Sequence, residues 1–156
     1  MADDKRPVNS QPQGTAPMLV GGNRNARNFP IDSDGRRDWS YGLLDCFDRR
    51  GLYCWTMGCP CVVYSKNRQR LRSLQNQGRP LVGGGERYDK QCCIYCALSF
   101  SGFCWAIKMQ SRTRAEVRER YGIREDSNGD YITSWCFAPC ALTQERREIE
   151  LEENSF

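Results

Sequence analysis

Cysteine placement restricts what this chain can fold into more than any other feature of the sequence. Nine of the ten cysteines lie in three stretches that contain no charged residue, and the tenth, Cys46, lies just upstream. The uncharged stretches are residues 51–65, 91–107 and 131–144. Each contains a Trp directly beside a Cys, in the pairs Cys54-Trp55, Cys104-Trp105 and Trp135-Cys136. Because apolar burial drives folding, we expect the three stretches to meet and form the core of one domain.

The remaining sequence predicts a mainly α-helical fold, a small single cysteine-rich domain of about three helices joined by loops. We expect helices over about residues 62–74, 91–121 and 139–150, with Gly122 as a C-cap. Gly and Pro predict a loop over 76–89, and EDSNGD predicts a turn over 125–130. The sequence divides into a disordered N-terminal tail (1–38), poor in large apolar residues, the cysteine-rich domain (39–150), and a C-terminus that frays (151–156).

The uncharged stretches are short for membrane spans. A spanning helix needs about 20 apolar residues, whereas the stretch 91–107 has 17 residues and includes Gln91 and Gly102. A buried helix, or one at a membrane interface, fits better. The N-terminus lacks the apolar core of a signal peptide, so we expect the thiols to face the cytosol and to be reduced. The basic run 66–72 is interpreted as the solvent face of a helix, and we expect no nucleic-acid partner.

Spacing among the cysteines indicates a metal site. The chain has no histidine, so a zinc site would be built mainly from thiolates, with carboxylates as the other strong ligands. The tight Cys59-Pro60-Cys61 turn could direct two thiols at one ion, and residues 136 and 140 share a face if they are helical. The hypothesis is one shared site whose ligands are Cys54, Cys59, Cys61, Cys136 and Cys140.

Other readings of the cysteines remain open. Cys93 and Cys96 form a single CxxC, which could be a secondary metal site, a redox pair or part of a packed helix. About half of the ten cysteines could be small buried hydrophobes. Without histidine the usual nucleophile pairs are absent, and Arg49 or Arg50 could only lower a Cys pKa, so we expect no enzyme.

Four segments, taken in order, resemble the placenta-specific-8 cysteine-rich family, which includes plant cadmium resistance proteins, cell number regulators and cornifelin. CWTMGCPC (54–61) is similar to its Cys-x4-Cys-Pro-Cys element, and residues 39–54 to its opening Trp, Gly-Leu and Asp-Cys positions. KMQSRTRAEVRERYGI and CFAPCALTQERREIE resemble its basic and closing segments. The chain departs from the family pattern at Trp55, Asn128 and Trp135, where many members have Cys.

The resemblance implies a membrane-associated protein of divalent metal binding, transport or tolerance, or of cell-number control. It implies the plasma membrane as location, with the cytoplasm as the alternative, and zinc, structural or cargo, as the metal. Transport by three short apolar segments would require a homo-oligomer. Glu145 and Glu148 of the closing element could supply oxygen ligands or cap a neighbouring helix. The alternative is a soluble regulatory or scaffold module whose cysteines, with structural zinc or disulfides, serve only the fold.

Overall fold

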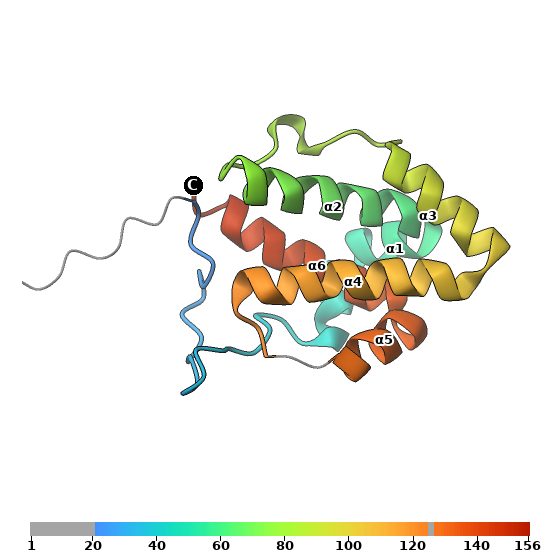
Figure 1. Cartoon of the computed structure of the whole chain (residues 1–156). Coiled ribbons are helices and arrows are strands. Elements are labelled where there is room, and N and C mark those ends of the chain that lie inside the picture. The colour runs from blue at the N-terminus through green and yellow to red at the C-terminus, as the bar shows by residue number, and fades with distance from the viewer. Residues whose placement is uncertain (1–20, 125–126) are drawn as a thin grey trace, which may run out of the picture.

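The computed structural model describes residues 21–124 and 127–156 as one small, mainly helical domain (Figure 1). These ranges contain no strand, only an isolated bridge between Arg37 and Ile123. The elements are η1 (Leu43–Arg49), α1 (Arg50–Gly58), α2 (Pro60–Asn76), η2 (Val82–Gly84), α3 (Lys90–Ser101), α4 (Phe103–Tyr121), α5 (Ser127–Cys136) and α6 (Ala138–Glu153). The predicted fold class is confirmed, although the chain has more helices than the three expected.

Helices α2, α4 and α6 form the centre of the bundle, where they lie next to one another (Figure 1). Both α2 and α6 have a proline in the first turn, where the missing N–H leaves no hydrogen bond unmade. The inner faces of the three helices meet in one apolar cluster, which also includes Ile123. The members from the three helices are Leu71, Leu74, Val117, Tyr121 and Ile149.

The prediction of one long helix over 91–121 is wrong in one respect, because two separate helices, α3 and α4, meet at Gly102. The Gly102 backbone is extended, with φ −179° and ψ 91°, and the chain reverses there so that α3 and α4 form a hairpin (Figure 1). The far end of α4 follows the prediction. Gly122 is left-handed (φ 61°) and its N–H caps the carbonyls of Arg118 and Glu119.

Both predicted ends of the domain differ from the structure. Residues 1–20 lie outside the described part, but 21–38 pass across one end of the bundle (Figure 1), and Arg37 is buried. Arg37 N–H donates to the Gly122 carbonyl at 2.8 Å. At the C-terminus the helix continues to Glu153, since the buried Glu152 carboxylate accepts hydrogen bonds from Tyr121 and from an arginine of α4. Buried polar contacts therefore fix two segments that composition alone predicts to be disordered or frayed.

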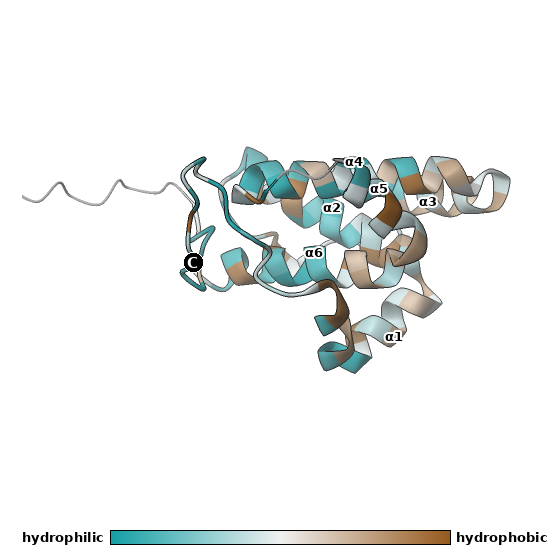
Figure 2. Cartoon of the chain, turned by 90° about the horizontal axis from the view of Figure 1, so that it is seen from below, coloured by the Kyte–Doolittle hydropathy of each residue, from teal (hydrophilic) through white to brown (hydrophobic). Residues whose placement is uncertain are grey.

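The uncharged stretches form only part of the core. A second cluster of buried residues draws on all three of them and contains Val63, Tyr64, Tyr95, Ala106 and Leu142. The three Trp residues are instead exposed, and so is the cysteine beside each of them. The expected core therefore lies partly on the surface, at the end of the bundle where Figure 2 shows brown ribbon on α1, α3 and α5. In the described ranges, no helix is both long and apolar enough to cross a bilayer.

Candidate thiol site

The junction between α1 and α2 positions the Cys-Pro-Cys turn. Cys59 has a non-helical backbone (φ −139°, ψ 68°), which ends α1, and its N–H still donates to the Trp55 carbonyl at 2.9 Å. Pro60 then starts α2, so that Cys61 lies in its first turn. A pocket of about 300 Å³ opens beside this turn. Its lining consists of Gly58, Cys59, Pro60, Cys61, Tyr95, Cys96, Ser99 and Phe100.

Helix α3 brings a second set of thiols to Cys61. Cys92 and Cys96 are four residues apart, so they share one face of α3. Burial and, to a smaller extent, the neighbouring Cys61 thiol together raise the pKa of the Cys92 thiol to about 12. Desolvation and Cys61 also raise the pKa of Cys96, with smaller effects from Cys93 and Cys59. Residues 59, 61, 92 and 96 are called the thiol cluster below.

These raised pKa values determine what the thiol cluster can do. Cys92 is protonated at neutral pH, and a protonated thiol is a poor nucleophile. A metal ion would have to displace the proton, because only the thiolate is a ligand. Binding of a thiophilic ion by the cluster would therefore release protons, and nucleophilic attack by Cys92 would require its prior deprotonation.

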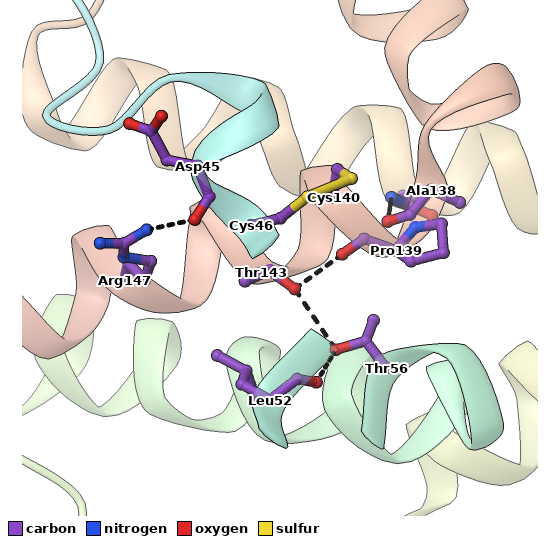
Figure 3. Close-up of a disulfide and its surroundings, with 10 residues drawn as sticks. Asp45, Cys46, Leu52, Thr56, Ala138, Pro139, Cys140, Thr143 and Arg147 are labelled. Carbon is purple, nitrogen blue, oxygen red and sulfur yellow. Dashed lines mark hydrogen bonds between the residues drawn. A yellow bond between two sulfur atoms is a disulfide. The ribbon is translucent and has the colours of Figure 1, made fainter. Parts of the chain in front are cut away.

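The five predicted ligands do not form one site. Cys54 and Cys136 are exposed on α1 and α5, whereas Cys140 is bonded to Cys46, with their Cα atoms 5.2 Å apart (Figure 3). Over 21–124 and 127–156, no three Cys, Asp or Glu side chains are already arranged to hold a metal ion. The structure does not bring this set together, because α6 directs Cys140 to η1 and not to the Cys-Pro-Cys turn.

The disulfide joins two segments that also share polar contacts. Arg147 on α6 donates to the Asp45 carbonyl on η1 at 2.7 Å (Figure 3). One turn earlier on α6, the Thr143 hydroxyl faces that of Thr56 on α1 at 3.5 Å. Cys140 thus attaches η1 to α6, and Thr143 contacts α1 beside it. The other eight cysteines are free.

The two candidate glutamates are buried in different environments. Glu148 is an ion-pair partner of Arg37 at 3.2 Å and accepts hydrogen bonds from the Ser40 backbone N–H and hydroxyl. Its carboxylate is fully used by the protein, so it is not available to a metal ion. Glu145 is completely buried with no hydrogen bond to either oxygen, and Arg114 lies 3.8 Å away.

Burial determines the charge of Glu145. Desolvation raises its pKa to about 8, and the attraction of Arg114 only partly opposes this effect. The guanidinium already donates to Asp130 at 3.1 Å and to Gln144 at 2.7 Å. Glu145 is therefore a neutral acid at pH 7, which makes it a poor metal ligand there.

Cys92 is the site residue that sequence reasoning missed. The CxxC spacing indicates Cys93 and Cys96, but Cys93 is exposed, whereas Cys92 is buried against Cys61. The i, i+4 spacing of Cys92 and Cys96 could have identified it, because that spacing puts two helical side chains on one face.

Comparison with known proteins agrees with the motifs. The model of the PLAC8 family matches residues 39–148. The chain is 33% identical over 124 residues to cell number regulator 10 of Zea mays, covering 78% of this chain and 71% of that protein. It is 30% identical over 120 residues to PLANT CADMIUM RESISTANCE 10 of Arabidopsis thaliana, covering 74% and 63%. No solved structure matches. This chain therefore belongs to the PLAC8 family.

Proposed function

We propose that this chain is a non-enzymatic, membrane-associated protein that binds soft divalent ions, Zn²⁺ or Cd²⁺, through the thiol cluster. Membership in a family with relatives named for cell number regulation and cadmium resistance supports a role in metal tolerance or growth regulation. The finer proposal assigns the metal to thiols on α2 and α3. Transport, as opposed to binding, would require several copies of the chain around one path.

The observation that carries the proposal is the meeting of Cys61 with Cys92 and Cys96 beside a pocket that Cys59 also lines. Four thiolates are the donor set of many closed zinc sites, with Zn–S distances of about 2.3 Å. Thiolates also prefer soft ions over Mg²⁺ or Ca²⁺. Cys59 lies at a helix junction and not inside a helix, so side-chain rotation there can complete the set.

Metal tolerance of cells tests this function. Expression in cells sensitive to Cd²⁺ or Zn²⁺ should raise their tolerance, and the double change Cys59→Ser/Cys61→Ser should abolish the gain. Cys54→Ser is the matched control, since it removes an exposed thiol of the same motif that lies outside the pocket. Equal protection by the double variant and the control would contradict a role for the thiol cluster.

The second candidate is a regulatory or scaffold module whose cysteines hold the fold. The Cys46–Cys140 disulfide between η1 and α6 favours it, because that pair has a structural role. This candidate predicts that the Cys59→Ser/Cys61→Ser variant retains full activity in a growth assay and that the chain remains in the supernatant after high-speed centrifugation. Pelleting with membranes at high salt would contradict it.

A further inference from the structure

One end of the bundle exposes large apolar side chains from four helices. Figures 1 and 2 place α1, α5 and the turn between α3 and α4 at this end. Phe100, Trp105 and Trp135 have exposed fractions of 88%, 61% and 58%. The exposed apolar set, called the aromatic end, consists of Trp55, Met57, Ile94, Phe100, Trp105, Tyr131, Ile132, Trp135 and Phe137. Surfaces of this kind mark interaction sites.

The charged residues that flank the three uncharged stretches in the sequence are mainly basic where they reach the surface. The residues directly flanking the three uncharged stretches are Arg50, Lys66, Lys90, Lys108, Asp130 and Glu145. All four of the basic ones reach the surface, whereas both acidic ones are buried beside Arg114. Two cations also lie over exposed rings. Lys108 Nζ is 5.5 Å from the Trp105 ring centroid, and Arg87 Cζ is 5.9 Å from that of Trp55.

This combination matches a lipid interface. Trp and Tyr are enriched at headgroup depth, and Lys and Arg extend from apolar surroundings to reach phosphates. The exposed side chains lie on separate projecting parts, the α3–α4 turn and α1, which Figure 2 shows extending away from one another. Fluid lipid can cover such a divided surface, whereas a second copy would need a matching shape.

We infer that the aromatic end inserts into the headgroup boundary of an anionic bilayer without crossing it, with Lys108 and Arg87 binding lipid phosphates. This inference rests on the proposed membrane association and names the surface responsible. It places the thiol cluster near the lipid surface, because Phe100 of the aromatic end also lines the pocket beside Cys59.

Vesicle binding of the full chain tests the inference. Flotation would use phosphatidylcholine vesicles with and without phosphatidylserine, and vesicles with brominated acyl chains would quench inserted Trp. The Trp105→Ser/Trp135→Ser variant should reduce partitioning roughly tenfold or more, since it removes two large apolar groups from the interface. Lys108→Glu should reduce binding only to the vesicles that contain phosphatidylserine. Val82→Ser is the control, because Val82 is 94% exposed on η2, away from this end.

The outcomes separate this inference from the proposed function. Binding and quenching that the Trp variant loses and the Val82 variant keeps would support it, provided that circular dichroism shows both variants folded. Equal binding by the Trp variant would overturn the choice of surface while leaving membrane association standing. No vesicle binding by the unaltered chain would overturn both. A dimer that the Trp variant dissociates, without vesicle binding, would make this end an interface between copies and overturn the lipid assignment.

Discussion

Glu145 gives the sharpest prediction about stability. Its carboxyl group is completely buried, neither oxygen has a hydrogen bond, and the nearest cation, Arg114, is 3.8 Å away. Burial raises its pKa from 4.5 to about 8. The folded chain therefore keeps this proton over a pH range in which the unfolded chain has lost it. The resulting stabilisation is complete below pH 4.5 and is lost as the pH rises through 8.

The magnitude follows from the pKa difference. Each pKa unit corresponds to about 1.36 kcal/mol. Between pH 5 and pH 8 the unaltered chain should therefore lose roughly 4 kcal/mol of its free energy of unfolding through this group. Glu145→Gln keeps the side-chain volume and cannot ionise. The free energy of unfolding of the variant minus that of the unaltered chain should therefore increase by about this amount between pH 5 and pH 8.

Urea unfolding followed by far-UV circular dichroism, at several pH values and constant ionic strength, measures this difference. Glu145→Leu is a second neutral variant of similar size, and it should show the same increase with pH. If ionisation of Glu145 in the unaltered chain is the cause, the free energies of unfolding of both variants should rise relative to that of the unaltered chain by the same amount as the pH increases. A difference that stays constant with pH would refute the reasoning, because Glu145 would then be ionised in the fold and stabilised by Arg114.

Three further predictions concern other buried groups. Glu148→Ala should lower the free energy of unfolding by about 3–5 kcal/mol, measured in urea, because it leaves Arg37 buried without its counter-charge. A cost below about 1 kcal/mol would show that the pair does not anchor the N-terminal segment. Cys46→Ala/Cys140→Ala should cost about 2–5 kcal/mol under non-reducing conditions, and adding reductant to the unaltered chain should remove the difference. Affinity for Cd²⁺, followed by ultraviolet thiolate absorption, should rise about tenfold per pH unit for each thiol proton displaced, since the Cys92 pKa is raised to about 12. A pH-independent affinity would exclude Cys92 as a ligand.

Helices with strong end signals could be predicted from the sequence. The expected segment 62–74 corresponds to α2, and the segment 139–150 corresponds to α6, because Pro60 and Pro139 mark their first turns. Gly122 is also predictable as a C-cap, because glycine readily adopts the left-handed conformation found there.

Elements stabilised by tertiary contacts could not be predicted in this way. Helix α1 buries only Thr56 and contains two glycines, so neither periodicity nor propensity marks it as a helix. The sequence does not indicate the break at Gly102 either, since a single glycine is tolerated within a helical pattern. Packing of the hairpin formed by α3 and α4 decides that conformation, and packing depends on residues far apart in the sequence.

The candidate site shows the same division. The Cys-Pro-Cys turn could be recognised locally, and Cys59 and Cys61 do line the pocket. Their partners depend on which helices pack together. Helix α3 supplies Cys92 and Cys96, whereas the expected partner Cys140 is bonded to Cys46. Spacing along one chain cannot distinguish these pairings, which follow from the hairpin that the sequence did not reveal.

The most direct test of the thiol cluster is alkylation of the folded chain with and without Cd²⁺, with each cysteine followed by mass spectrometry. We expect saturating Cd²⁺ to protect one set of thiols together, consisting of Cys59, Cys61, Cys92 and Cys96. The exposed cysteines of α1 and α5, Cys54 and Cys136, should react at an unchanged rate. Protection of Cys54 and Cys136 in place of Cys92, or no protection at any cysteine, would contradict metal binding by the thiol cluster.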